Sequence, residues 1–437
     1  MTHADDTFER RVHAWLHADA EHRVPDHLDA VLGRTSMARQ RPAWSIPERW
    51  LPVDTTFRPR FFHVPEAGRL VLVAALITIL AALLVFAVGS RQQRLPPPFG
   101  PARNGIMLSS ADGDIFAIDP STAKRTAIVS GSLFEFGPLF SRDGTRFSFL
   151  REGPKDCGKP DCGLILVIAN ADGSGVHEVT PALPGLDGVD WSPDGTQVAI
   201  LAMAPSGTGH VIEIVQSDGS GIRTIDIGRP VHEPSWLPPD GREIIFRGEE
   251  LVAGDPPPGI FAVRPDGTGL REISTRPAVD ANDYQGVAVS PDGQYVTYQD
   301  TNFDAIPPNG FFQVHVMSLR TGEDRVLPQP KGAAAMAAVF SPDGSKVAYL
   351  RIGSNGLLQM VVAPVDGTGL GIAVGPQARF GSEGATINNY LWSPDGTAVI
   401  ANYDVEKVAR LLPIDGSAAT VLAHGELALP AYQRLAR

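Results

Sequence analysis

The chain has 437 residues, of which 43% are hydrophobic and 20% are charged, a composition typical of a folded protein rather than a disordered one. Its formal net charge is −12 at pH 7. Residues 1–69 carry ten arginines and ten acidic residues, so the excess lies in the remainder and argues against nucleic acid or anionic lipid as a partner. Thirteen aspartates followed by glycine are enough to account for this excess, so we favour turn chemistry as its cause, with an acidic binding surface as the alternative.

Residues 1–68 combine short helical patterns with a proline-rich stretch. Apolar residues at helical spacing predict a first helix, and Pro25 can open a second one. Trp44 and Trp50 lie between prolines in a segment that we expect to be extended. We interpret both tryptophans as residues that dock on a partner or the membrane interface, with simple packing against the helices as the alternative. So small a helical region is expected to fold fully only against a partner or a second copy.

An apolar segment from Leu70 to Val88 follows, nineteen residues without a charge and bounded by arginines. Its length suits a bilayer core of roughly 30 Å, so it predicts a transmembrane helix within residues 69–90. We expect an uncleaved anchor rather than a signal peptide, because 68 residues precede Arg69 and no strong cleavage site follows the segment.

Residues 91–103 form a proline-rich linker. The stretch Leu95–Pro101 holds four prolines in seven residues, which favours a stiff polyproline conformation. We expect a spacer that holds the following domain a short, fixed distance from the bilayer.

The two cysteines, Cys157 and Cys162, lie close together in one predicted loop. Two ligands alone do not make a zinc site, so we favour a local disulfide and predict no bound metal. A disulfide requires an oxidising compartment, which places the C-terminal part outside the cytoplasm and the N-terminus inside. The arginines on either side of the predicted span are nearly equal in number, so the positive-inside rule says little about its orientation.

A five-residue motif recurs six times in the remainder of the chain, with its aspartates 51, 46, 52, 51 and 52 residues apart. In most copies serine, proline, aspartate and glycine follow an apolar residue; proline and glycine supply the backbone angles of a tight turn and aspartate caps it. A second Asp-Gly turn follows most copies. A period near 50 with several short strands is typical of β-propeller blades. The copies are Phe140–Gly144, Trp191–Gly195, Leu237–Gly241, Val289–Gly293, Phe340–Gly344 and Trp392–Gly396.

Residues 104–130 look like one further unit without the proline motif, with a turn at Asp112-Gly113. The sequence therefore predicts an all-β, seven-bladed β-propeller over residues 104–437, with six blades as the alternative if the first unit only completes the last one. Because a propeller must close its ring, we expect Glu426–Tyr432 to be the closing strand.

These repeats resemble those of TolB-type bacterial propellers, in which Trp-Ser-Pro-Asp-Gly precedes a strand and a second Asp-Gly turn follows. The resemblance implies the propeller fold from Asn104 to Ala423 and a WD-like repeat. A small helical module, one span and a large outer domain also resemble the layout of bacterial anti-sigma regulators. These resemblances imply a single-pass protein of the bacterial cell membrane with an extracytoplasmic propeller.

We therefore expect a non-enzymatic sensor or binding protein whose cytoplasmic module engages a transcriptional regulator. One alternative is a TolB-like envelope scaffold for protein–protein interaction, and another is an enzyme with a hidden site in the propeller channel. The sequence contains no nucleophile elbow, no zinc-protease motif and no phosphate-binding glycine loop. It accordingly predicts no enzyme activity, no catalytic residues and no cofactor, and it leaves the ligand and the protein partners unnamed.

Overall fold

The computed structural model divides the chain into two compact units, Met1–Arg91 and Gln92–Arg437. In the first unit it describes only Leu76 and Thr78, both helical. The predicted helices of residues 1–68 and the rest of the predicted span therefore lie outside the described residues. In the second unit the described residues are 95–153, 163–207, 209–248, 259–274, 287–301, 312–381, 384–385, 387–424 and 428–437.

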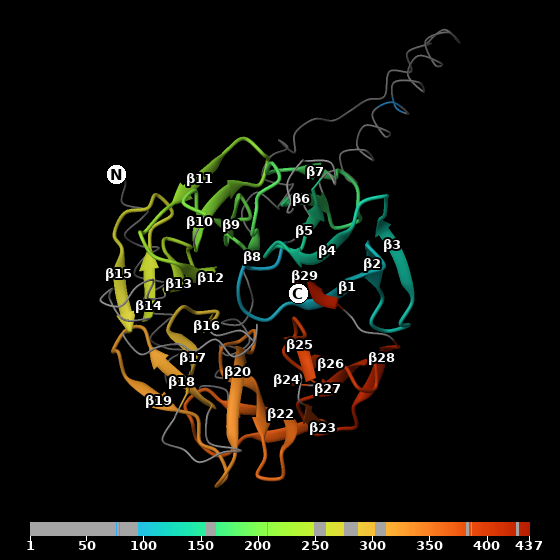
Figure 1. Cartoon of the computed structure of the whole chain (residues 1–437). Coiled ribbons are helices and arrows are strands. Elements are labelled where there is room, and N and C mark those ends of the chain that lie inside the picture. Colours follow the sequence, from blue (N-terminus) through green and yellow to red (C-terminus); the bar gives the residue numbers. More distant parts are fainter. Residues whose placement is uncertain are drawn as a thin grey trace, which may run out of the picture. The chain divides into compact units, whose positions relative to one another are not determined.

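The second unit is a ring of seven antiparallel sheets around a central axis (Figure 1). The prediction of seven blades is confirmed, and the six-bladed alternative is wrong. Blade 1 comprises β29 (Ala428–Leu435), β1 (Arg103–Ala111), β2 (Asp114–Ile118) and β3 (Arg125–Val129). Blade 2 comprises β4 (Glu135–Phe140), β5 (Arg146–Glu152), β6 (Leu164–Asn170) and β7 (His177–Glu178). Blade 3 comprises β8 (Asp187–Trp191), β9 (Gln197–Met203), β10 (His210–Gln216) and β11 (Ile222–Ile225).

The other four blades have the same antiparallel order. Blade 4 comprises β12 (Val231–Trp236), β13 (Ile244–Gly248), β14 (Gly259–Val263) and β15 (Arg271–Ser274). Blade 5 comprises β16 (Val287–Val289), β17 (Tyr295–Thr301), β18 (Phe312–Ser318) and β19 (Asp324–Val326). Blade 6 comprises β20 (Ala334–Phe340), β21 (Lys346–Ile352), β22 (Leu357–Pro364), β23 (Ile372–Gly381) and β24 (Gly384–Ala385). Blade 7 comprises β25 (Ile387–Trp392), β26 (Ala398–Tyr403), β27 (Val408–Pro413) and β28 (Thr420–His424).

The ring is closed by β29, the last strand of the chain, which pairs antiparallel with β1 and forms the inner strand of blade 1. The prediction of a closing strand at the C-terminal tail is thereby confirmed. Blade 2 packs tightly against this strand: a Cβ added at Gly144 would lie 2.2 Å from the carbonyl oxygen of Arg434. Glycine at this turn is therefore required both by its φ of 70° and by the close approach of β29.

The Ser-Pro-Asp-Gly turns join the inner strand of a blade to its second strand, and hydrogen bonds within the turn explain the motif. In blade 3, Ser192 Oγ donates to Asp194 Oδ1 at 2.7 Å, and the backbone N–H of Thr196 donates to the same oxygen at 3.0 Å. The bond from Thr196 forms an Asx turn, and the bond from Ser192 fixes the aspartate from the other side. The same pattern recurs around Asp143, Asp343 and Asp395.

We expect these turns to make the propeller sensitive to acid. Hydrogen bonds from Ser174 lower the pKa of Asp172; burial raises the pKa of Asp194, but hydrogen bonds from Thr196 and Ser192 lower it by more. A folded-state pKa below the unfolded value gives stability that is full above the unfolded pKa and is lost as the pH falls through the folded one. The melting temperature should change little from pH 7 to about 5 and fall steeply below about 4. A melting temperature that stays constant down to pH 3 would contradict this. The pKa is lowered in Asp119, Asp143, Asp172, Asp194, Asp218, Asp266, Asp343, Asp366, Asp395 and Asp415.

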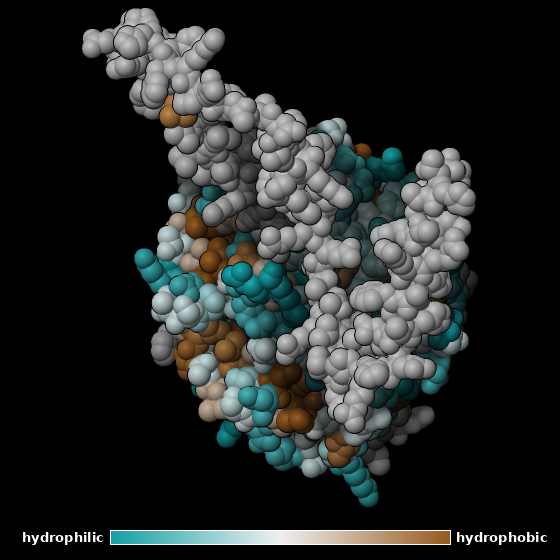
Figure 2. Space-filling model, turned by 180° about the vertical axis from the view of Figure 1, so that it is seen from behind, coloured by the Kyte–Doolittle hydropathy of each residue, from teal (hydrophilic) through white to brown (hydrophobic). Residues whose placement is uncertain are grey.

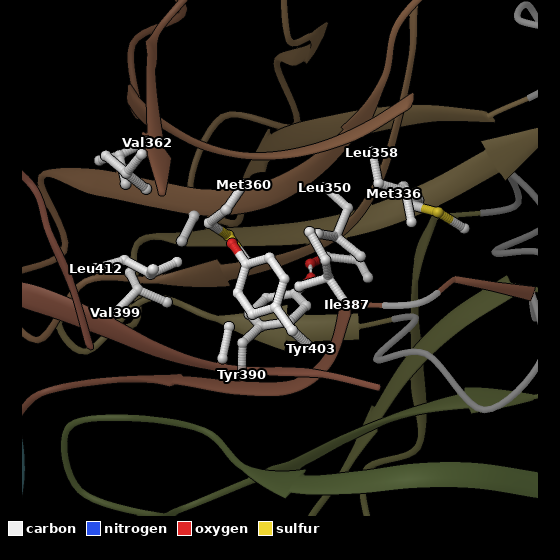
Figure 3. Close-up of a cluster of buried hydrophobic side chains, with 14 of the residues drawn as sticks. Met336, Leu350, Leu358, Met360, Val362, Ile387, Tyr390, Val399, Tyr403 and Leu412 are labelled. Carbon is white, nitrogen blue, oxygen red and sulfur yellow. Dashed lines mark hydrogen bonds between the residues drawn. The ribbon is translucent and has the colours of Figure 1, made fainter. Parts of the chain in front are cut away.

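The hydrophobic core lies between the blades, with one cluster of buried side chains at each of the seven interfaces. Successive residues of a strand point to opposite faces of its sheet, so Ala199 packs toward blade 4 while Val198 and Ile200 pack toward blade 2. Each blade is covered on both faces by its neighbours, which explains why its strands are apolar on both faces. Figure 3 shows the interface of blades 6 and 7, where Met360 and Tyr403 are among the side chains in contact.

The outer rim carries exposed hydrophobic side chains directly after the second Asp-Gly turns. Val176, Ile222, Leu270 and Leu370 are each between 40% and 48% exposed. They belong to four different blades, and on the face shown in Figure 2 hydrophobic and hydrophilic residues are interspersed over the described surface. Hydrophobic residues scattered in this way are ordinary at a protein surface and do not identify a binding site.

Candidate functional site

The inner strands of five blades carry a β-bulge at the same place, where the strand lines the central channel. A residue with left-handed backbone lies in each bulge, and in blades 4, 6 and 7 it is not glycine, with φ of 53°, 54° and 44°. This conformation costs such a residue about 1–2 kcal/mol, and strain of this kind clusters at functional sites. The five residues are Gly137, Gly188, Glu233, Ala337 and Asn389.

Two cavities occupy the channel. One, of about 230 Å³, lies at the end of the Ser-Pro-Asp-Gly turns, and the other, of about 530 Å³, extends along the inner strands of blades 1, 2, 3 and 7. Both are lined by Arg142, Leu391, Tyr432 and Arg434, so the two cavities share a wall. Three of the bulge residues, Gly137, Gly188 and Asn389, line the larger cavity. The mouth at the turns therefore leads into the channel past two arginines.

The mouth is ringed by prolines from the turns of four blades, and in blade 2 an arginine takes the place of proline. Arg142 is the second residue of the turn Ser141-Arg142-Asp143-Gly144. It lines the mouth together with Trp236, Trp392 and Phe340, which form aromatic walls. The prolines of the ring are Pro238, Pro291, Pro342 and Pro394.

Arg142 is held in place from blade 3. Its Nη2 lies 2.5 Å from Asp190 Oδ1, and the side chains of Arg142 and Asp190 are 29% and 14% exposed. The other carboxylate oxygen of Asp190 accepts hydrogen bonds from Ser235 Oγ at 3.0 Å and from the backbone N–H of Trp236 at 2.8 Å. A single carboxylate thus orients Arg142 and ties blade 3 to blade 4.

Arg434 lies on β29 and lines the same wall as Arg142. Its Nη2 donates to the carbonyl oxygens of Pro97 at 2.8 Å and Gly100 at 2.7 Å. Burial, reinforced by the nearby charge of Arg142, lowers the pKa of Arg434 to about 10. The Nε atoms of both arginines are buried and make no hydrogen bond within the described part of the chain.

Two guanidinium groups in one half-buried hollow have the chemistry to bind an anion. Each offers donors in a planar fork that matches a carboxylate. Among the described residues, only Asp190 contributes a carboxylate to Arg142, while the prolines and aromatic side chains of the mouth contribute no charge. An anion bound between Arg142 and Arg434 would offset their repulsion and use the donors that remain.

The sequence did not predict either arginine as a site residue. One signal was present, because Arg142 is the only residue that replaces proline in a Ser-x-Asp-Gly copy of the motif. No comparable signal marked Arg434, because it reaches the channel only through the position of the closing strand β29. The predicted site residues Trp44, Trp50, Cys157 and Cys162 lie outside the described residues, so the partner contacts and the disulfide stay predictions.

Two features of the described residues concern metal binding and membrane insertion. No group of three or more His, Cys, Asp or Glu side chains among them could hold a metal ion. Likewise, none of the helical structure described is long and apolar enough to cross a bilayer.

The linker predicted to be a stiff polyproline spacer at Leu95–Pro101 contacts the propeller through its C-terminal half. Pro97 and Gly100 accept hydrogen bonds from Arg434, and Phe99 lines the mouth of the channel. The residue after the spacer, Ala102, is buried, and its backbone N–H donates to Pro394 O at 2.8 Å. This part of the linker therefore packs on the propeller, and its expected role in spacing the propeller from a bilayer stays a prediction.

Comparison with known proteins adds the following. The sequence matches no protein-family model and no curated protein. TolB from Acinetobacter baumannii is 14% identical with a TM-score of 0.43, and the match covers 78% of this chain and 68% of that one. A putative TolB from Agrobacterium tumefaciens is 17% identical with a TM-score of 0.44, covering 72% and 100%. An oligogalacturonate lyase in complex with manganese is 15% identical with a TM-score of 0.51, covering 74% and 94%.

The prediction that the chain is not an enzyme is corrected by the last of these structures. Oligogalacturonate lyase is an enzyme, and it shares the fold. A propeller can assemble a site from inner strands that lie far apart in the sequence, so the absence of a contiguous catalytic motif does not exclude catalysis. At these identities the comparisons show the fold alone: the described chain is a seven-bladed β-propeller, similar in fold to oligogalacturonate lyase.

Proposed function

We propose that the propeller is a protein-interaction domain whose channel mouth binds a carboxylate-bearing segment of a partner protein. The observation that carries this proposal is the pair Arg142 and Arg434 on the wall shared by both cavities. Arginine and tryptophan are enriched among the residues that dominate protein-binding energies, and Trp236 and Trp392 flank the same mouth.

The contribution of Arg142 is tested by its substitution. Binding of fluorescein-labelled tetraglutamate to the full-length protein is measured by anisotropy, for wild type and for Arg142→Gln. We expect Arg142→Gln to weaken binding about tenfold or more, because a hydrogen bond to a charged group contributes about 1.5–3 kcal/mol.

The matched control is Arg320→Gln, the same change at an exposed turn between β18 and β19. Its affinity should match that of wild type, and tetraglutamine should bind none of the three proteins measurably. Equal binding of tetraglutamate and tetraglutamine, or equal loss in both variants, would refute the proposed site.

A second candidate ligand is an acidic oligosaccharide. Galacturonate units carry carboxylates to which the same arginines could donate hydrogen bonds, and oligogalacturonate lyase has a similar fold. Oligogalacturonate is therefore the second probe in the same assay. Tight binding of the saccharide with none of the peptide would assign the site to a carbohydrate and overturn the protein-interaction proposal.

We further propose that this propeller lies outside the cytoplasm on a bacterial membrane, anchored by residues 70–88, with residues 1–68 engaging a cytoplasmic regulator. The support is the uncharged apolar segment and the cysteine pair, both features of the sequence. Affinity purification of the full-length protein from membranes tests it. A stoichiometric cytoplasmic regulator that is lost on Trp44→Ala and Trp50→Ala is the expected result, whereas recovery of envelope proteins alone would refute the signalling role.

A further inference from the structure

The proline-rich segment before blade 1 makes directed contacts at the mouth of the channel. Arg434 donates to two of its carbonyl oxygens, those of Pro97 and Gly100. Just beyond it, the backbone N–H of Ala102 donates to Pro394 O at 2.8 Å. The segment is thus fixed to blade 1 and blade 7 at points only a few residues apart.

Phe99 is the side chain that the segment places in the mouth. Arg142 Cζ lies 5.1 Å from the centre of its ring, within the range of a cation–π contact. The ring lines the cavity of about 230 Å³ together with Trp236, and Pro98 lines a neighbouring groove of about 450 Å³ beside Pro193. Both arginines of the candidate site therefore contact this segment.

This surface has the chemistry that recognises polyproline segments. Prolines have no backbone N–H, so a run of them offers carbonyl acceptors and ring surface. Protein domains that bind such segments use aromatic-lined grooves. Here Trp236 and Trp392 supply aromatic walls, and Arg434 supplies the donor to two carbonyl groups.

We propose that the channel mouth is a docking surface for an extended proline-rich segment, and that residues 96–101 of the same chain are its resident occupant. A second part rests on the proposed function: the segment competes with the carboxylate-bearing partner for Arg142 and Arg434. A tethered occupant acts at an effective concentration in the millimolar range. A partner must therefore bind tightly enough to displace a competitor at that concentration. Its displacement would free the part of the chain that leads back to residues 70–88.

The docking is tested with a labelled peptide of the sequence Leu-Pro-Pro-Pro-Phe-Gly-Pro-Ala, which is that of residues 95–102. In a full-length variant, Pro96, Pro97, Pro98 and Phe99 are replaced by Gly-Ser-Gly-Ser. The length and the backbone carbonyl groups are kept, but the phenylalanine ring, the proline rings and the polyproline preference that holds the segment in place are lost. We expect the peptide to bind this variant at least tenfold more tightly than wild type. Phe99→Ala should give an intermediate gain, and Phe134→Ala, at a phenylalanine that is 48% exposed at the start of blade 2, should give none.

The outcomes separate the two parts of the proposal. Equal peptide binding to wild type and to the Gly-Ser variant, or no binding to either, would overturn the docking surface whatever tetraglutamate does. Competition is measured as the affinity for tetraglutamate, which should rise at least tenfold in the Gly-Ser variant. If the peptide binds as expected but tetraglutamate binds neither protein, the docking surface stands and the proposed function fails. If tetraglutamate binds both proteins equally, the proposed function stands and the competition is refuted.

Discussion

Removal of residues 428–437 is expected to leave the propeller unable to fold as a stable monomer. The deletion takes away β29, which supplies the inner strand of blade 1 and pairs with β1 at five positions. It also removes two side chains that pack in opposite directions: Ala431 belongs to the core between blades 1 and 2, and Tyr432 to the core between blades 7 and 1. Blade 1 would therefore lose packing against both of its neighbours, blade 2 and blade 7.

The expected size of this effect follows from the groups lost. Each backbone hydrogen bond contributes about 1 kcal/mol and burial of a large side chain about 1.5–3 kcal/mol, so the loss exceeds about 5 kcal/mol. Folded domains have a total stability of about 5–15 kcal/mol. The exposed edge of β1 should then pair with another chain and give soluble oligomers or aggregates.

Circular dichroism during heating and size-exclusion chromatography measure the result. The matched control lacks only Ala436 and Arg437, which follow β29, and it should behave as the full chain does. A protein without residues 428–437 that stays monomeric and melts within about 3 °C of wild type would show that ring closure does not depend on β29.

The repeated turns made the fold predictable. Each copy of Ser-Pro-Asp-Gly specifies its own backbone within five residues, as the hydrogen bonds to Asp194 show. Six copies at nearly equal spacing therefore mark six blades, and the further unit at residues 104–130 adds the seventh. The closing strand could be predicted as well, because a ring leaves one inner position that only the chain end can fill.

The channel could not be predicted in the same way. Arg142 and Arg434 are almost 300 residues apart, and the closed ring brings both to the wall of the same cavities. The bulges at Glu233, Ala337 and Asn389 could not be predicted from the sequence. A left-handed backbone is normally predicted at glycine, and these residues are not glycine. The contact of the linker with Arg434 could not be predicted either, because it forms only when β29 closes the ring. Local signals specify the blades, whereas the site depends on how the blades meet.

The tryptophan of the motif shows how a repeated residue joins two blades, and its removal has the second large effect that we expect. Trp191 is 0% exposed and belongs to the core between blades 2 and 3. Its Nε1 lies 3.2 Å from the carbonyl oxygen of Leu139 and 3.1 Å from Ser148 Oγ, both in blade 2. Trp392 donates in the same way from blade 7 to Val339 O in blade 6, at 3.1 Å.

Trp191→Ala should lower the free energy of unfolding by about 3–5 kcal/mol, because it leaves a large cavity in a packed interface. Trp191→Phe keeps most of the ring and loses the donor, so we expect about 1–3 kcal/mol from the unpaired oxygen of Leu139 and the loss of volume. Urea denaturation followed by circular dichroism measures both variants against wild type. Equal losses in the two variants would assign the role of Trp191 to its hydrogen bonds, and a loss below about 1 kcal/mol in Trp191→Ala would show that the interface of blades 2 and 3 repacks without it.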